Sequence, residues 1–246
     1  MNTKIAIIIS LIAGLSTLIG SFIILFIKRN SDKTIIISLA FSSSIMFFIS
    51  IFDLIPESYN YIKLNNNITT TITLVIISII IGITISFIID KLIPEQQNNI
   101  KKIGILSFLT IIIHNIPEGM ATFITTYDNL KLGISIAIAI CLHNIPEGIT
   151  ISLPIYYSTN KKTKALLYSL IAALAEPLGA IITAIFLKKY INSNFIGILF
   201  SVIAGLMIYI SILKLLTESF SYKKKILTII SFTLGILLFI IFSIIF

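Results

Sequence analysis

Residues 103–125 read IGILSFLTIIIHNIPEGMATFIT, and residues 131–155 read KLGISIAIAICLHNIPEGITISLPI. Each run is apolar and has about the 20 residues that cross a bilayer core as a helix. Each contains the same hexapeptide, HNIPEG, at positions 114–119 and again at 143–148. A charged group at the centre of a spanning helix costs about 2.5–3.5 kcal/mol on insertion scales, so ionisable residues at this depth indicate function. Both histidines of the chain lie in this repeat, which predicts a metal site inside the membrane.

The composition is typical of an integral membrane protein. Hydrophobic residues make up 57% of the 246 positions, charged residues make up 11%, and the mean hydropathy is +1.08. Because long apolar runs satisfy their backbone hydrogen bonds as helices, we predict an all-α protein. It should form one polytopic domain, residues 1–246, with eight transmembrane helices and no soluble domain. The expected helices cover roughly residues 5–27, 34–55, 70–93, 103–125, 131–155, 165–187, 195–217 and 226–246.

The net charge of +8 predicts topology and not nucleic-acid binding. The loops after the first, third, fifth and seventh expected helices carry 12 lysines and arginines, and the other three loops carry 4. Since positively charged loops stay in the cytoplasm, both termini are expected outside the cell. The basic loops are expected to contact anionic membrane lipids. A cell-membrane location follows, and the richness in isoleucine, lysine and asparagine suggests a bacterial source.

The two hexapeptides present the same groups at the same spacing. Residues four apart share a helix face, so the histidine of each copy stacks on its glutamate, with the asparagine at a neighbouring edge. The proline should kink the helix and free the carbonyl four residues earlier, and the glycine lets another backbone approach closely. Because consecutive spanning helices are antiparallel, a pseudo-two-fold axis in the membrane plane should relate the copies. The expected centre contains His114, Glu118, His143 and Glu147, with Asn115 and Asn144 beside it.

These ligand types favour a borderline divalent ion. Imidazole and carboxylate suit Zn²⁺, Fe²⁺, Co²⁺, Mn²⁺ or Cd²⁺, whereas thiolates suit Cu⁺ and all-oxygen cages suit Ca²⁺ or Mg²⁺. Glu176, in the stretch AEPLGA at 175–180, is expected to complete a second, more oxygen-rich site. The alternative for Glu176 is a structural carboxylate bonded to a nearby hydroxyl. The single cysteine, Cys141, excludes an internal disulfide and is interpreted as a core residue in preference to a ligand.

Other polar residues have less specific interpretations. Asp53, near the end of the second helix, either lines an entrance or lies at the headgroup level. Asp90, Glu57 and Glu218 lie at expected helix ends, where a solvated charge needs no partner. The run 42–44, three serines, is expected to serve close helix packing in preference to pore lining.

The paired HNIPEG motifs on the fourth and fifth expected helices, with AEPLGA on the sixth, resemble the ZIP (Zrt/Irt-like) family of divalent metal transporters, in its bacterial ZupT-like branch. The resemblance covers essentially the whole chain. It implies an importer of zinc and related ions with a binuclear centre in a bundle with pseudo-two-fold symmetry. It also implies a homodimer, and an elevator-like movement of the first, fourth, fifth and sixth helices against the rest. The implied primary ligands are His114, Glu118, His143 and Glu147, and the implied secondary ligands are Asn115, Asn144 and Glu176 with the shared glutamates.

One departure from the ZupT-like pattern concerns the seventh helix. That branch commonly carries an acidic pair there, whereas this chain has Leu213 and Lys214. Lys214 is expected either to lower the local ion concentration at an entrance or to pair with an acid such as Asp53. A role for this helix in bringing metal to the site is therefore in doubt.

Three classes of function remain to be compared. We favour a transporter that works by alternating access, without ATP, since no nucleotide-binding motif is present. Its ion is cargo, and no prosthetic group is expected. An intramembrane metal-dependent hydrolase is the alternative, but it would want an open water position and often the spacing His-Glu-x-x-His, which is absent. A metal sensor is the third class, although the short loops leave no output domain. We therefore predict that the protein is not an enzyme.

Overall fold

A computed structural model describes residues 2–26, 32–93, 99–187 and 192–245. The predicted helix ends at 27 and 246 lie outside this part of the chain. So do four of the basic loop residues counted above, namely Lys28, Arg29, Lys188 and Lys189.

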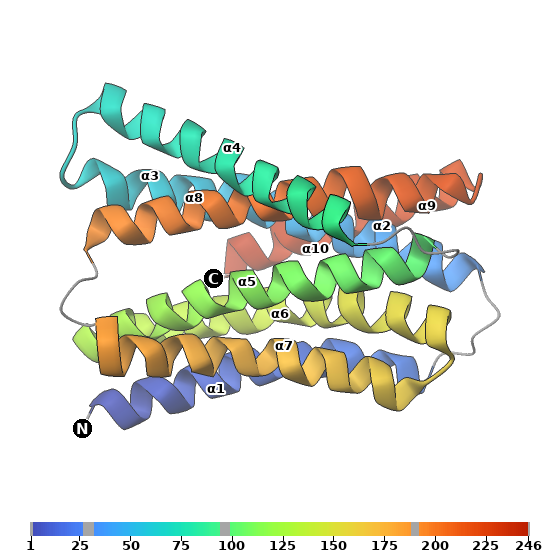
Figure 1. The fold of residues 1–246 in the computed structure, drawn as a ribbon, viewed down its shortest axis with the longest axis horizontal. Helices are drawn as coiled ribbons and strands as arrows, with labels where there is room; N and C mark the ends of the chain where they lie inside the picture. The colour runs from blue at the N-terminus through green and yellow to red at the C-terminus, as the bar shows by residue number, and fades with distance from the viewer. Residues whose placement is uncertain (1, 27–31, 94–98, 188–191, 246) are drawn as a thin grey trace.

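The predicted all-α membrane fold is confirmed: within the described ranges every regular element is helical, and the helices run back and forth as eight rods (Figure 1). Seven rods are long and apolar enough to cross a membrane, and the eighth has the shorter apolar stretch Lys225–Ile241. The rods are α1 (Asn2–Ser21) with η1 (Phe22–Leu25); α2 (Asp32–Ile49) with η2 (Ser50–Leu54) and α3 (Ile55–Lys63); α4 (Ile68–Leu92); α5 (Asn99–Asp128); α6 (Leu130–Thr159); α7 (Lys162–Ile182) with η3 (Thr183–Leu187); α8 (Ser193–Ile210) with η4 (Ser211–Leu216) and α9 (Thr217–Ser221); and α10 (Lys225–Ile245).

Several helices extend beyond the predicted apolar runs. The second rod continues from the predicted end at residue 55 to Lys63, because Pro56 falls in the first turn of α3, where no amide donor is needed. Helices α5 and α6 are 30 residues each and continue through Pro117 and Pro146. Hydropathy alone misses these ends, since polar residues remain helical where the rods leave the apolar layer.

The rods pack as two groups. We call α1, α5, α6 and α7 the site unit, because each of these helices packs on the other three. We call α2, α3, α4, α8, α9 and α10 the scaffold unit, in which α4 packs on α8 and α10 packs on α2. The units meet mainly where α2 lies against α6 and where α5 lies against α8.

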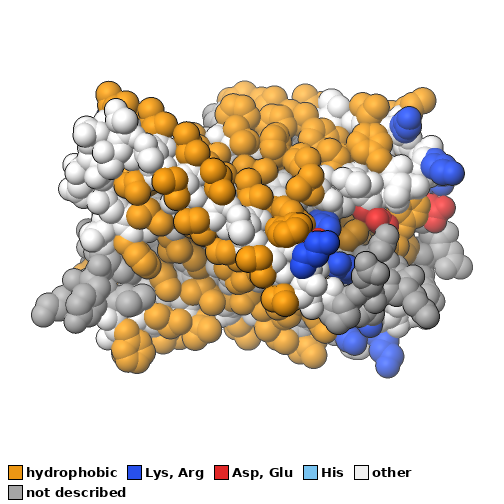
Figure 2. Space-filling view, turned by 45° about the horizontal axis from the view of Figure 1, so that its top comes forward, with side chains coloured by type: hydrophobic (Ala, Val, Ile, Leu, Met, Phe, Trp, Pro, Cys, Tyr) orange, Lys and Arg blue, Asp and Glu red, His pale blue; other side chains and the backbone are white. Residues whose placement is uncertain are grey.

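The surface has an apolar belt and one basic end. Figure 2 shows hydrophobic side chains spread over the middle of the molecule, with lysines gathered toward one end of this face. The basic end is where α4 ends, α5 begins and α9 turns into α10 (Figure 1). The belt fits a bilayer core, and the positive-inside rule assigns the basic end to the cytoplasm. We call the opposite end the outer end.

Reciprocal glycines hold α4 against α8. A side chain at Gly82 would collide with the carbonyl oxygen of Val202, and one at Gly205 would collide with the carbonyl oxygen of Ile79. Small residues let spanning helices approach closely, so that van der Waals contacts drive their association. This crossing therefore requires glycine on both sides.

We expect Gly82→Val to lower the melting temperature of the protein in detergent, measured by circular dichroism. Overpacking typically costs about 1–3 kcal/mol, and about 2–4 °C per kcal/mol is usual for a chain of this size. The matched control is Ile81→Val on the same helix, where the side chain is exposed and a smaller residue creates no collision. Equal melting temperatures for the two variants would contradict the close crossing.

Candidate metal centre

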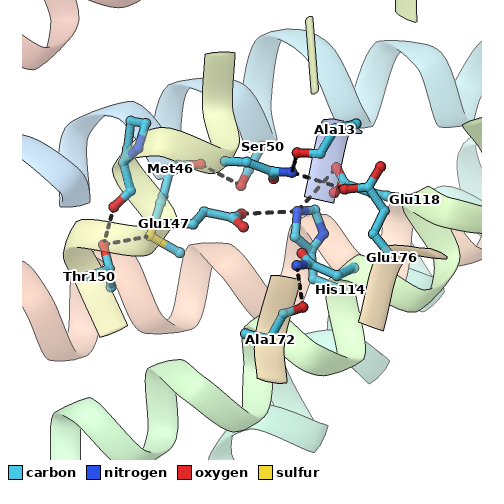
Figure 3. Close-up of polar contacts among 12 residues, drawn as sticks. Ala13, Met46, Ser50, His114, Glu118, Glu147, Thr150, Ala172 and Glu176 are labelled. Atoms are coloured by element: carbon cyan, nitrogen blue, oxygen red, sulfur yellow. Dashed lines mark hydrogen bonds and ion pairs between the residues drawn. The ribbon is translucent and has the colours of Figure 1, made fainter. Parts of the chain in front are cut away.

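The structure brings His114, Glu118 and Glu147 together in the interior. The Nε2 atom of His114 lies 3.2 Å from Oε1 of Glu118 on the same helix and 3.1 Å from Oε1 of Glu147 on α6 (Figure 3). The three side chains are at most 3% exposed. A carboxylate buried this deeply needs a charged or strongly polar partner. The structure therefore contains the predicted contact of histidine with glutamate within α5. It also contains the predicted contact of this pair with α6.

The two asparagines form hydrogen bonds that join the helices of the site unit. Nδ2 of Asn115 donates to the carbonyl oxygen of Ala172 on α7 at 2.9 Å. Nδ2 of Asn144 donates to the carbonyl oxygen of Ala13 on α1 and to Oε2 of Glu176 on α7, both at 3.0 Å. The asparagines therefore use their amide groups for helix packing, which leaves their carbonyl oxygens for other partners.

Several buried oxygens of the cluster lack a hydrogen-bond partner within the described part of the chain. They are Oδ1 of Asn115, Oδ1 of Asn144 and Oε1 of Glu176. A buried polar atom without a partner costs free energy, and such oxygens are suited to a hard or borderline cation. The described side chains do not form a ready-made cage of three or more His, Cys, Asp or Glu groups. The imidazole of His114 instead contacts two carboxylates directly.

His143 is the fourth of the predicted primary ligands. His143 lies on the described helix α6, but its side chain is outside the described set. Its role in the centre stays a prediction.

The contacts of the two hexapeptides follow one pattern, as a pseudo-two-fold axis requires. A side chain at Gly119 would collide with the carbonyl oxygen of Glu176, and one at Gly148 would collide with that of Thr17. Position 176 follows the asparagine acceptor Ala172 by four residues, and position 17 follows the acceptor Ala13 by four. Helices α7 and α1 therefore make equivalent contacts, with Glu176 and Thr17 at equivalent places. The two places differ chemically, because one holds a carboxylate and the other a hydroxyl.

Two neighbours of the centre were not predicted. Thr150 donates from Oγ1 to the carbonyl oxygen of Pro146 at 3.0 Å, and lies 3.8 Å from Sδ of Met46 on α2 (Figure 3). Both residues are buried. Thr150 follows Glu147 by three residues, so its place on the same helix face was readable from spacing. Met46 has no comparable signal, because nothing in the sequence relates α2 to α6.

The serine run on α2 packs helices, as predicted. All three serines are buried. Ser43 donates to the carbonyl oxygen of Ser211 at 2.8 Å, and Ser42 donates to that of Pro146 at 3.4 Å. These bonds join α2 to η4 and to α6, and no pore is needed to explain them.

A cavity of about 330 Å³ lies beside the centre on the outer side. Its lining includes exposed Asp53 and Glu57 from the second rod and buried Glu118 and Thr125 from α5. The cavity therefore extends from the surface to a carboxylate of the centre. Asp53 therefore lies in the lining of this cavity, and its role as an entrance residue stays a prediction.

The interpretation of Asp90 as a solvated helix end was wrong. Asp90 is 5% exposed, and its Oδ2 atom lies 2.5 Å from Nζ of Lys214 and accepts from the hydroxyl of Tyr209 at 3.0 Å. Its Oδ1 atom lies 3.3 Å from Nζ of Lys102. Lys214 thus pairs with Asp90 at the basic end, and not with Asp53, because η4 faces the end of α4.

We expect Asn144→Ala to lower the melting temperature more than Asn115→Ala, with both measured by circular dichroism in the presence of a chelator. Asn144 makes two hydrogen bonds, one of them to a carboxylate, and bonds to charged groups contribute about 1.5–3 kcal/mol against about 0.5–1.5 for neutral ones. Asn115→Ala is the matched control, since it removes one neutral bond at the equivalent place. An equal or larger loss for Asn115→Ala would contradict the asymmetry.

Comparison with known proteins gives one consistent result. The family model described as ZIP Zinc transporter matches residues 94–243. The zinc transporter ZupT of Campylobacter jejuni is 39% identical to this chain, and the match covers 89% of this chain and 89% of the relative. The zinc transporters ZupT of Akkermansia muciniphila and Streptococcus mutans are each 37% identical, and cover 92% and 95% of this chain and 92% and 94% of their own lengths. The predicted resemblance is confirmed, and this multi-pass membrane protein belongs to the ZIP family of zinc transporters.

Proposed function

We propose that this protein carries Zn²⁺ across the membrane into the cytoplasm through a buried site formed by α5, α6 and α7. The observation that carries the proposal is the contact of His114 with Glu118 and Glu147 in the interior of an apolar bundle. Two carboxylates and neutral imidazoles balance a divalent charge, which offsets much of the cost of burying the ion. Family membership supports transport and argues against the hydrolase alternative.

The proposed ligands come from three helices of the site unit. They are His114, Asn115, Glu118, His143, Asn144, Glu147 and Glu176. The orphaned oxygens of Asn115, Asn144 and Glu176 support a second, oxygen-rich position next to the first. The carboxylate of Glu118 is suited to serve both positions, since it lines the outer cavity and contacts His114.

Differences between the two ends of the bundle support transport toward the cytoplasm. The outer cavity supplies ions to Glu118, and Asp53 and Glu57 in its lining attract cations. Protons compete with the metal for His114 and the glutamates, because metal ligands must be deprotonated, so protonation assists release. Homodimer formation and contact with anionic lipids stay predictions from the resemblance and from the charge distribution.

We expect proteoliposomes with the wild-type protein to take up Zn²⁺ in a saturable way, and Glu147→Gln to reduce the uptake. Loss of an outer-shell partner of a metal site already costs about 10–100-fold in affinity or activity, so loss of a ligand should cost at least about tenfold. The matched control is Asp32→Asn, which removes a carboxylate that is exposed at the basic end. Tight binding without flux in the wild type would contradict transport, and equal uptake by Glu147→Gln would contradict the site.

We also expect Cd²⁺, Co²⁺ and Fe²⁺ to compete with Zn²⁺ uptake and Mg²⁺ and Ca²⁺ to leave it unchanged. Imidazole and carboxylate together favour borderline ions, whereas Mg²⁺ and Ca²⁺ prefer oxygen ligands alone. The measurement is the initial rate of radioactive Zn²⁺ uptake with each competitor in excess. Inhibition by Ca²⁺ or Mg²⁺ at equal concentration would show that the histidines do not contribute to selection.

A further inference from the structure

The charged cluster around Asp90 lies at the opposite end of the bundle from the outer cavity and joins the two units. Asp90, Tyr209 and Lys214 belong to the scaffold unit, on α4, α8 and η4, whereas Lys102 belongs to the site unit, near the start of α5. The pair of Lys102 and Asp90, 3.3 Å apart, therefore crosses the boundary between the units.

We infer that the Lys102–Asp90 ion pair is a latch that holds the basic ends of the two units together in the outward-facing arrangement, and that Lys214 keeps the Asp90 carboxylate paired when the latch opens. This inference rests on the proposed function, because it assigns the cluster a part in alternating access.

The position of the cluster supports a role in closing the cytoplasmic side. The outer cavity is lined by both units, by Asp53 and Glu57 of the scaffold unit and by Glu118 of the site unit. A separate cavity of about 220 Å³ lies at the basic end, and its lining includes Asp90, Lys102 and Leu106. Leu106 is 1% exposed and lies two helical turns before His114 on α5. The cavity at the basic end therefore reaches, along α5, to about two helical turns from the centre, and the cluster lies in its lining.

Alternating access requires the units to move against each other, commonly as rigid bodies around the site. Such a movement changes distances across the boundary and leaves distances within a unit unchanged. Lys102 therefore moves relative to Asp90, whereas Lys214 and Tyr209 remain at 2.5 Å and 3.0 Å from its carboxylate. The outward-facing arrangement gains an attraction that the inward-facing one lacks.

The second lysine explains how such a latch can open. Asp90 is buried, and a buried carboxylate without a partner is strongly unfavourable. If Lys102 were the sole cation, separation would leave the carboxylate without a cation. Lys214 prevents this, and its ammonium group also lies 5.7 Å from the ring centre of Tyr209, which helps to fix its position. Glu218 lines the same cavity as the two lysines.

The test uses a thiol reporter at the basic end, without transported metal. Leu106→Cys is introduced together with Cys141→Ser, and the rate of reaction with a charged maleimide is measured from the cytoplasmic side of inside-out vesicles containing chelator. Lys102→Gln should raise the rate at least about fivefold, since coupling of this kind is typically worth about 5–150-fold. Lys102→Arg should keep the rate within about twofold of the reporter background, because the charge is retained. Lys214→Gln should lower it, because Asp90 then depends on Lys102.

The matched control is Lys91→Gln, which removes an exposed positive charge next to Asp90 on α4. An unchanged rate in Lys102→Gln, or an equal rise in Lys91→Gln, overturns the latch. Asp90→Asn supplies a second variant and should also raise the rate; if Lys102→Gln does not fold, an unchanged rate in Asp90→Asn overturns the latch. Zn²⁺ uptake by the reporter protein is measured in parallel. Absence of Zn²⁺ uptake would count against the proposed function. The maleimide reaction rates are measured in chelator, so they test the latch independently of transport.

Discussion

The interior contact of one imidazole with two carboxylates is the constraint on which the rest of the bundle depends. His114, Glu118 and Glu147 are buried, so each needs a polar partner: Glu118 meets His114 within α5, and Glu147 meets it from α6. The compensation works only if α5 and α6 stay in register to within the length of a hydrogen bond. Asn115 and Asn144 support that register because both bond to α7, one to the carbonyl oxygen of Ala172 and the other to the carboxylate of Glu176. The chemistry of the site and the packing of the site unit are therefore one problem.

Much of this arrangement could be predicted from the sequence because two signals are strong. Apolar runs of bilayer length predict the rods, and the doubled hexapeptide predicts which rods meet. The ends of the rods were less predictable, since Lys63 and Asp128 are polar residues that continue helices beyond the apolar layer. Met46 and the partners of Asp90 could not be predicted, because they depend on how distant segments pack. Spacing relates residues within a helix, and it carries no information on contacts between α2 and α6 or between α4 and α5.

The internal symmetry of the site unit has a physical cost and a physical use. The same kind of helix contact occurs twice in this unit. Gly119 packs on the carbonyl of Glu176, and Gly148 packs on the carbonyl of Thr17. A fully symmetric centre would place a carboxylate on α1 as well, and this fourth buried acid, beside Glu118, Glu147 and Glu176, would need further positive charge. Thr17 is neutral, so the equivalent place on α1 adds no carboxylate, whereas Glu176 keeps a carboxylate near Asn144. Symmetric packing thus coexists with an asymmetric set of polar side chains.

The scaffold unit contains two π-helical segments that lie toward opposite ends of the bundle. Two π-helical segments, η2 and η4, interrupt the second and seventh rods, and π segments often occur at functional positions because the extra residue redirects side chains. The segment η2 carries Asp53, which lines the outer cavity, and η4 carries Lys214, which pairs with Asp90 at the basic end. The two rods run in opposite directions (Figure 1), so a similar irregularity near the C-terminal half of each falls toward opposite sides of the membrane. An acid at the outer segment lines the cavity that reaches Glu118, whereas a lysine at the inner segment pairs with a buried acid. The positive charge of Lys214 is therefore placed at the basic end, away from the carboxylates that line the outer cavity.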